Sequence, residues 1–183
     1  MELILSDLYR YEGRNDIKAF IHSYAINEGF RFSVWLRVCS VARRNKLTKV
    51  LVLPWSRLIY KHYKYKYGYD IPYAIDIGPG LRLFHIGGIV FCPEKCGKNV
   101  SISQNTTVGM TIHEGQKEYP ILGDNVYIAP GAMVIGGIHV GNDVAIGSNS
   151  VLTKSVDDHS VIVGIPAKII SYKGARDYVS NRI

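Results

Sequence analysis

An aliphatic residue recurs at every sixth position in the second half of the chain. The unbroken row is Leu122, Ile128, Val134, Val140, Ile146 and Leu152. A second row, four residues after each member of the first, is small or branched: Val126, Ala132, Ile138, Val144 and Ser150. Neither a helix of about 3.6 residues per turn nor an alternating strand has a period of six. A coil with three flat faces of six residues each has this period. One aliphatic side chain per face points inward and fills the interior of the coil.

The same period continues upstream in two other phases. The upstream rows are Ile71, Ile77, Leu83 and Ile89, then Val90, Cys96, Ile102 and Val108. The step from Ile89 to Val90 predicts a slip of one residue, and the gap of 14 between Val108 and Leu122 predicts an inserted loop at 110–121. Inserted residues leave a solenoid as loops, and such loops often carry function. We therefore predict an all-β solenoid, a parallel β-helix of about five turns at three hexads per turn, over 68–172. Residues 173–183 form a C-terminal tail.

The first part of the chain has a different composition. Residues 1–70 carry 13 Lys/Arg against 6 Asp/Glu, whereas residues 71–183 carry 9 of each. Apolar spacing predicts an α-helical, basic segment at 1–67, with helices at 17–26 capped by Asn15 or Asp16, at 30–44, and at 49–67 bent at Pro54. The run 57–67 mixes cations and tyrosines. It fits a helix with a solvated basic face, or peripheral contact with an anionic membrane surface; no nucleic-acid motif accompanies it.

Other features narrow the class of protein. No apolar run approaches the ~18–20 residues of a transmembrane helix, and the first residues lack the basic start of a secretory signal. The three cysteines are an odd, low count, which favours a reducing cytoplasm over a disulfide framework. Cys92 and Cys96 have no second pair of ligands at zinc spacing, so we expect no metal site.

The repeat resembles the hexapeptide-repeat acyltransferases, whose solenoid is a left-handed β-helix. The segment Gly164-Ile165-Pro166-Ala167-Lys168 is similar to their terminal signature. The stretches 67–71 and 84–88 resemble in particular the serine acetyltransferase branch, which includes exopolysaccharide O-acetyltransferases. The resemblance implies acetyl-CoA as co-substrate, a homotrimer with sites at subunit boundaries, and pairing of trimers through the helices as a further option.

The resemblance also implies catalytic residues. His85 stands where the family has its general base, which takes the proton of the acceptor hydroxyl as this attacks the thioester. Neutral imidazole suits that role, because its unperturbed pKa is ~6.5. Asp70 matches an aspartate that orients the histidine. The simpler interpretations are a hydrogen-bonded surface histidine on a coil for His85, and an aspartate that forms the turn between helix and coil for Asp70.

The acceptor residues depart from the serine acetyltransferase pattern. Phe84, Glu118 and Tyr119 stand where that branch has an aspartate, an arginine and a histidine. A serine carboxylate facing Glu118 would be repelled. His113 in the inserted loop and Asp16 are further candidates for acceptor contact, with a solvated loop residue and a helix cap as the simpler interpretations.

The resemblance also implies a donor site in the groove between neighbouring solenoids, with a Thr-Lys pair and a terminal Lys at the nucleotide phosphates. Small residues allow the pantetheine arm to approach the backbone, and cations meet the nucleotide phosphates. The candidates are Gly109, Ala129, Gly147, Ser148, Thr153, Lys154 and Lys168.

We therefore predict a cytoplasmic, acetyl-CoA-dependent O-acetyltransferase acting on a sugar hydroxyl of a surface polysaccharide or its precursor. The alternatives are a serine O-acetyltransferase of cysteine biosynthesis and a non-catalytic hexapeptide scaffold. The triplet Phe84, Glu118 and Tyr119 argues against serine, and the presence of His85 with Asp70 argues against a scaffold.

Overall fold

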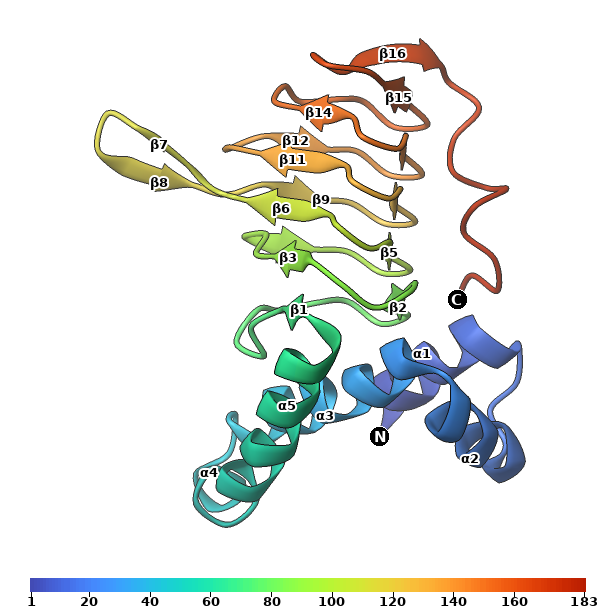
Figure 1. Ribbon diagram of the computed structural model, residues 1–183, viewed down its shortest axis with the longest axis vertical. Coiled ribbons are helices and arrows are strands. Elements are labelled where there is room, and N and C mark those ends of the chain that lie inside the picture. The colour runs from blue at the N-terminus through green and yellow to red at the C-terminus, as the bar shows by residue number, and fades with distance from the viewer.

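The computed structural model describes residues 1–183 and contains a bundle of helices followed by a stack of short strands (Figure 1). The helices are α1 (Glu2–Glu12), α2 (Ile17–Ile26), α3 (Glu28–Ala42), α4 (Lys46–Leu51) and α5 (Leu53–Tyr67). The strands are β1 (Tyr69–Asp70), β2 (Arg82–Leu83), β3 (Ile89–Phe91), β4 (Lys95–Cys96), β5 (Ser101–Ile102), β6 (Thr107–Gly109), β7 (Thr111–His113), β8 (Gln116–Glu118), β9 (Ile121–Leu122), β10 (Tyr127–Ile128), β11 (Met133–Ile135), β12 (His139–Val140), β13 (Ala145–Ile146), β14 (Val151–Leu152), β15 (Val161–Val163) and β16 (Lys168–Ser171).

The strands form the three faces of a parallel β-helix. The β3 face has the order β1-β3-β6-β11-β14, the β4 face β12-β9-β4, and the β5 face β16-β15-β13-β10-β5-β2. Between β10 and β13, Tyr127 pairs with Ala145 and Ile128 with Ile146, one turn of 18 residues apart. All six residues of the unbroken aliphatic row are buried. The predicted solenoid is confirmed.

The predicted slip between Ile89 and Val90 is wrong in its position. Phe91, not Val90, points into the core, because Phe91 pairs with Val108 and is fully buried while Val90 is 41% exposed. Leu83 and Phe91 are eight residues apart, whereas Ile102 and Val108 on the next coil are six apart. The coil therefore gains two residues at the turn between β2 and β3 and loses one directly afterwards.

Local signals define most helix ends. Asp16 caps α2 by accepting a hydrogen bond from the Ala19 amide at 2.9 Å. Gly13 and Gly68 end α1 and α5 in the left-handed conformation. The single bent helix predicted for 49–67 is wrong: α4 ends at Leu51 and α5 restarts at Leu53, with Pro54 in its first turn where no backbone donor is needed. The prediction also missed α1.

A buried ion pair joins the helices to the first coil. The Arg37 guanidinium donates to both oxygens of Asp7, at 2.9 Å each, and also to the carbonyl of Gly78 at 2.7 Å. Asp7 accepts from the Leu81 amide at 2.8 Å. Burial alone would lower the pKa of Arg37, but attraction to Asp7 raises it above its ordinary value. The pair thus links α1 and α3 to the backbone on which the solenoid begins.

A second contact between helices and coil depends on Gly29. A methyl group at Gly29 would lie 2.4 Å from the Leu83 carbonyl oxygen and 2.5 Å from the Tyr11 hydroxyl oxygen. We expect Gly29→Ala to lower the free energy of unfolding by about 1–3 kcal/mol, although alanine favours helices. Urea unfolding measures this. The exposed neighbour substitution Glu28→Ala is the control and should change stability by less than about 0.5 kcal/mol. Equal effects would contradict the packing argument.

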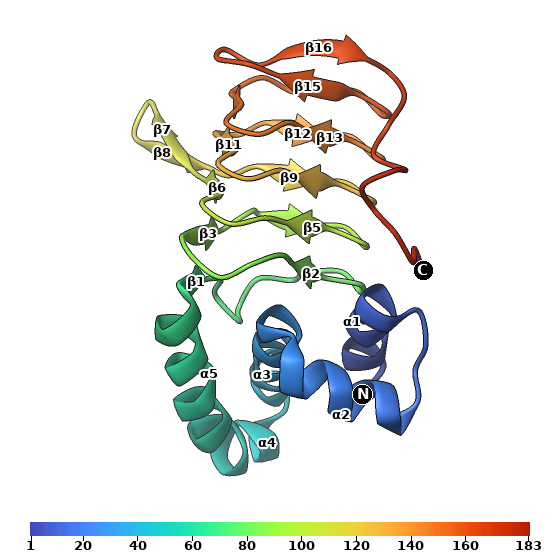
Figure 2. The same cartoon turned by 45° about the vertical axis from the view of Figure 1, so that its right-hand side comes forward.

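The C-terminal segment returns along the β5 face towards the helices (Figure 2). Ala175 and Val179 are buried beside Ala145. Asp143 accepts one hydrogen bond from Arg182 at 2.6 Å and pairs with the His159 ring at 3.0 Å. Partial burial would raise the pKa of Asp143, but these bonds hold it below its ordinary value. The tail is therefore part of the packed structure.

Candidate active site

The longer turn between β2 and β3 carries His85. His85 lies in the left-handed region at φ 52°, and Gly87 and Gly88 follow at φ 111° and 58°. The imidazole is exposed and makes no hydrogen bond within the chain, while the His85 carbonyl accepts from the Tyr69 hydroxyl at 2.8 Å. Burial raises the pKa of Tyr69, so that hydroxyl stays a donor. The Tyr69 hydroxyl thus fixes the backbone of the turn from the core side, while the His85 imidazole points to solvent.

The turns above His85 stack into one edge of the solenoid, where the β5 face meets the β3 face. Backbone bonds join successive turns: Asn105 donates to Gly87 at 3.1 Å, Gly131 to Gln104 at 3.0 Å, and Asn149 to Pro130 at 2.9 Å. We call this the histidine edge; it comprises 84–88, 103–106, 129–132 and 147–150.

Three of the predicted donor residues belong to the histidine edge. Ala129, Gly147 and Ser148 line a cavity of about 240 Å³ beside Tyr127 and Tyr178. The two tyrosine rings stack with their centroids 4.8 Å apart. The edge therefore offers small residues next to an aromatic wall, on the same side of the coil as His85. Neither tyrosine was predicted, since Tyr178 reaches this place only through the folded tail.

Asp70 lies on β1, below the histidine edge. Its carboxylate accepts from the Lys64 ammonium of α5 at 2.6 Å and makes no hydrogen bond to His85. The expected pair of Asp70 and His85 is therefore not formed in this chain, and an orienting role for Asp70 stays a prediction. The competing Lys64 was missed, because nothing in the hexad pattern places α5 beside the first coil.

The inserted residues form a hairpin, β7 paired with β8, which projects from the edge where the β3 face meets the β4 face (Figure 1). We call this the hairpin edge. His113 is exposed on β7. Glu118 and Tyr119 line a hollow of about 340 Å³ together with His139 and Ser155.

Three further donor candidates also lie at the hairpin edge. Gly109 ends β6 there, and the exposed Thr153 and Lys154 follow β14. The width of the β3 face thus separates two groups of predicted residues within one chain. His85 with its small-residue neighbours is on the histidine edge, and the acceptor candidates of the hairpin are on the other.

Phe84 belongs to the histidine edge, where its ring packs under the Arg82 guanidinium at 4.7 Å and against Tyr127 at 6.4 Å. The last two candidates lie at neither edge group. Asp16 is the cap of α2, and Lys168 is exposed on β16 at the far end of the stack. A single chain therefore brings His85 close to none of the predicted hairpin residues.

Comparisons with known proteins agree with this architecture. Residues 119–154 match the family described as bacterial transferase hexapeptide (six repeats). A serine acetyltransferase of Staphylococcus aureus (strain COL) is 43% identical over 111 residues, which are 60% of this chain and 52% of that protein. The serine acetyltransferase of Staphylococcus xylosus is 42% identical over 123 residues, 66% of this chain and 56% of that protein.

Solved structures extend the likeness to nearly the whole chain. Serine acetyltransferase from Brucella abortus in complex with coenzyme A has a TM-score of 0.76 at 26% identity, covering 94% of this chain and 68% of that one. The soybean serine acetyltransferase apoenzyme has a TM-score of 0.75 at 27% identity, covering 92% of this chain and 67% of that one. The helices are therefore matched as well as the solenoid.

Fold and repeat together define the class of this protein, a hexapeptide-repeat protein with a left-handed parallel β-helix preceded by helices. Within that class the chain is similar to the serine acetyltransferase branch of the hexapeptide-repeat acyltransferases. It spans about half the length of the curated relatives that it matches. The prediction of a sugar hydroxyl and of polysaccharide biosynthesis is wrong, because these relatives and structures are named serine acetyltransferases.

Proposed function

We propose that the chain is an acetyl-CoA-dependent serine O-acetyltransferase. The observation that carries the proposal is the exposed His85 imidazole, presented on the lengthened turn of a solenoid whose relatives are serine acetyltransferases. A structure in this branch holds coenzyme A. The three cysteines are free thiols, and a cytoplasmic location fits both them and this donor.

The proposed reaction is direct transfer. Neutral His85 accepts the proton of the serine hydroxyl while the hydroxyl oxygen attacks the thioester carbonyl of acetyl-CoA. The tetrahedral intermediate collapses, the carbon–sulfur bond breaks, and the coenzyme A thiolate takes the proton from the imidazolium. The products are O-acetylserine and coenzyme A, so protons and charge balance without an acyl-enzyme.

The site is completed by a second chain in this proposal. Within one chain the histidine edge and the hairpin edge are separated by the β3 face, so His85 lacks an acceptor wall. In a closed cyclic trimer, one edge of each chain faces the other edge of its neighbour. The hairpin of one chain would then lie beside His85 of the next, and acetyl-CoA would occupy the groove between them.

The donor residues divide between the two sides of that groove. Small residues on the histidine edge, Ala129 and Gly147, leave room for the pantetheine arm. Thr153 and Lys154 of the hairpin edge are exposed, as is Lys168, and the lysines would meet the phosphates as point charges.

Three residues weaken the serine site relative to the branch pattern. Glu118 and Tyr119 stand where the resemblance implies an arginine and a histidine, and the Phe84 ring packs on Arg82 and Tyr127 instead of supplying a carboxylate. With Glu118 repelling the substrate carboxylate, the proposal implies a raised KM for serine rather than a lost reaction.

The test is acetyl-CoA turnover by the purified chain with L-serine. We expect serine-dependent thiol release and O-acetylserine identified by mass spectrometry. L-Alanine, which lacks the hydroxyl, is the matched control and should release no thiol above the rate without acceptor. Equal release with serine and alanine, or no acetylated serine at millimolar substrate, would refute serine as the acceptor.

A further inference from the structure

Helices α4 and α5 expose an apolar row that the proposed reaction does not use. Trp55 and Leu58 on α5 are 72% and 62% exposed, and Ile59 continues the row. Positions i, i+3 and i+4 lie on one face of a helix. Leu47, Val50 and Leu51 repeat this spacing on α4 and are exposed as well. Large apolar side chains exposed together on neighbouring helices are typical of an interaction surface.

The same helices are strongly basic. Residues 43–69 contain eight Lys/Arg and no Asp/Glu. The eight are Arg43, Arg44, Lys46, Lys49, Arg57, Lys61, Lys64 and Lys66. Arg44 pairs with Asp76 and Lys64 with Asp70, while the other six have no carboxylate partner. Arg57, Lys61 and Lys64 line a hollow of about 300 Å³ with Tyr65 and Tyr73. The apolar row is therefore flanked by cations.

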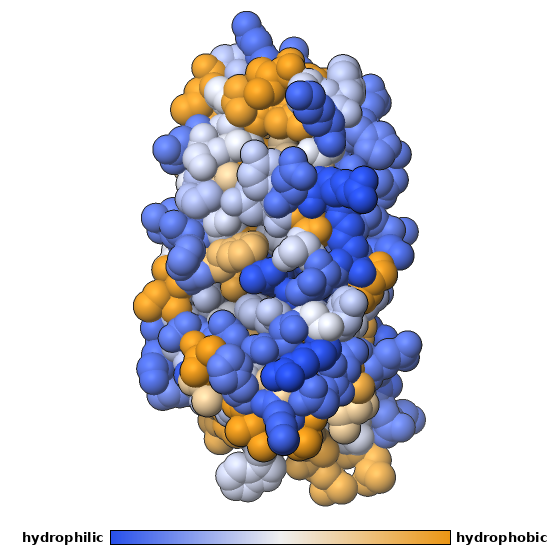
Figure 3. Space-filling model, turned by 90° about the vertical axis from the view of Figure 1, so that its right-hand side faces the viewer, coloured by the Kyte–Doolittle hydropathy of each residue, from blue (hydrophilic) through white to orange (hydrophobic).

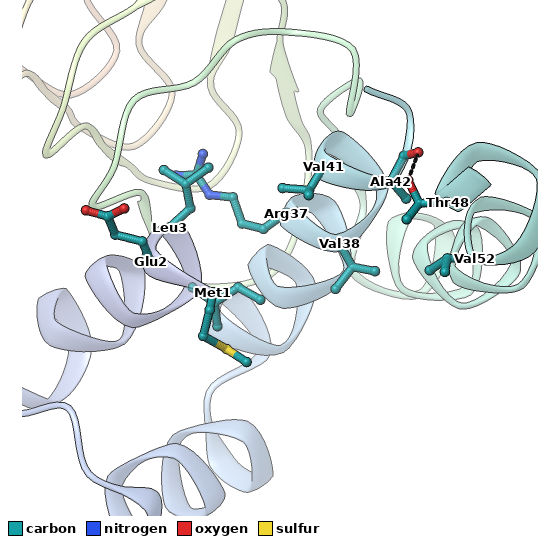
Figure 4. A pocket seen from close by; sticks show the side chains of 10 residues that line it. Met1, Glu2, Leu3, Arg37, Val38, Val41, Ala42, Thr48 and Val52 are labelled. Carbon is teal, nitrogen blue, oxygen red and sulfur yellow. Dashed lines mark hydrogen bonds between the residues drawn. The ribbon is translucent and has the colours of Figure 1, made fainter. Parts of the chain in front are cut away.

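The location of this surface favours docking. Figures 1 and 2 place α4 and α5 at the end of the molecule farthest from β16. Figure 3 shows the side opposite α5, and there too hydrophobic surface gathers at the helical end as well as at the opposite one. Beside α4, a largely apolar hollow of about 340 Å³ lies between α1, α3 and the α4–α5 junction. Val38, Val41 and Val52 form its sides, with Met1 at its margin (Figure 4).

We propose that the exposed face of α4 and α5 docks on an anionic lipid bilayer. An amphipathic helix that binds a membrane surface places apolar side chains at the acyl boundary and Lys/Arg among the headgroups. Tryptophan is suited to that boundary because one end of the indole is apolar and the other polar. Trp55, the leucines and the flanking cations meet each requirement.

Charge argues against a second copy as the occupant. Two such faces would bring their unpaired cations together without a single carboxylate between residues 43 and 69 of either chain. A nucleic acid would neutralise the cations, but it would leave Leu47, Val50 and Leu58 against a hydrated phosphate backbone. An anionic bilayer neutralises the cations with its headgroups and also removes the apolar row from water.

The test is flotation of the full chain with vesicles. One set contains equal parts of phosphatidylglycerol and phosphatidylcholine, and the other contains phosphatidylcholine alone. We expect the chain to float with the anionic vesicles, to float much less with the neutral ones, and to dissociate as salt is raised. Tryptophan emission should shift to shorter wavelength with anionic vesicles. Trp35 donates to Tyr24 inside the bundle, so the shift reports mainly on Trp55.

Matched variants locate the surface. Leu58→Ser on α5 is compared with Ile21→Ser on α2, because the two side chains are 62% and 63% exposed. Arg57→Glu combined with Lys61→Glu is compared with Lys18→Glu on α2. We expect the α5 variants to lower vesicle binding by about tenfold or more and the α2 variants to leave it within about twofold. Helical circular dichroism confirms that each variant folds.

Four outcomes would overturn the proposal. The first is equal binding to neutral and anionic vesicles, and the second is an equal loss of binding for the α2 and α5 variants. The third is self-association without vesicles, if Leu58→Ser abolishes that self-association. The fourth is binding of an oligonucleotide without binding of anionic vesicles. None depends on acetyl transfer, so this proposal and the proposed reaction stand or fall separately.

Discussion

Replacing His85 with asparagine is expected to lower kcat for acetyl transfer about 10²–10⁴-fold, the usual contribution of a general base. Asparagine tolerates the left-handed backbone that His85 adopts at φ 52°, so the turn keeps its shape. The imidazole makes no hydrogen bond within the chain, and its loss should therefore leave the unfolding temperature unchanged. Steady-state thiol release with saturating L-serine measures the effect on kcat.

His139→Asn is the matched control. His139 is also an exposed histidine of the solenoid, on β12, but it lies beside Glu118 at the hairpin edge of its own chain. We expect its substitution to change KM for serine more than kcat, because it is not the base. If both variants lowered kcat equally, or if His85→Asn retained more than about a tenth of the activity, another group would have to remove the proton.

Replacing Asp7 with alanine is expected to have the largest effect on stability. It leaves the Arg37 guanidinium, which is 3% exposed, without its carboxylate, and the Leu81 amide without its acceptor. Removing one partner of a buried ion pair costs about 3–5 kcal/mol. For a chain of this size, that corresponds to a fall of about 10 °C in the unfolding temperature. Urea and thermal unfolding measure it.

Two comparisons separate burial from charge. Asp76→Ala breaks the exposed Arg44–Asp76 pair and should cost less than about 1 kcal/mol. Asp7→Leu combined with Arg37→Met removes both buried charges and should be more stable than Asp7→Ala. If Asp7→Ala and Asp76→Ala destabilised the protein equally, the buried pair would not be what joins the helices to the first coil.

The solenoid could be predicted from sequence because its core is strictly periodic. Each inward residue from Leu122 to Leu152 follows the previous one after six positions, and all are buried. The prediction failed at the turn between β2 and β3, because its two additional residues interrupt the period of six. Val90 was placed inward there, although Phe91 fills the core. The same extra length displaces His85 from the coil, so the irregularity is itself a signal for the site.

The contacts that the helices and the C-terminal tail make with the solenoid could not be predicted. Nothing in the sequence marks the charged residues Asp7, Arg10 and Arg37 as buried, yet each is buried against the first coil. Burial and repulsion from Arg82 lower the pKa of Arg10 to about 10. Likewise, Tyr178 reaches Tyr127 and Arg182 reaches Asp143 only through the returning tail, at separations that no local pattern encodes. The acceptor prediction erred for a related reason: substitutions at Phe84, Glu118 and Tyr119 were taken to change the substrate class, and the named relatives favour serine instead.

The proposed reaction depends most on a site shared between chains, and mixed trimers test this directly. One chain carries His85→Asn, and the other has residues 112–117 of the hairpin replaced by a two-residue turn. Each is expected to be inactive alone. Mixed at random in equal amounts, about a quarter of the boundaries pair an intact His85 with an intact hairpin, so about a quarter of wild-type serine-dependent activity should return. No recovery in trimers shown to be mixed would contradict a site built from the two edges of neighbouring chains.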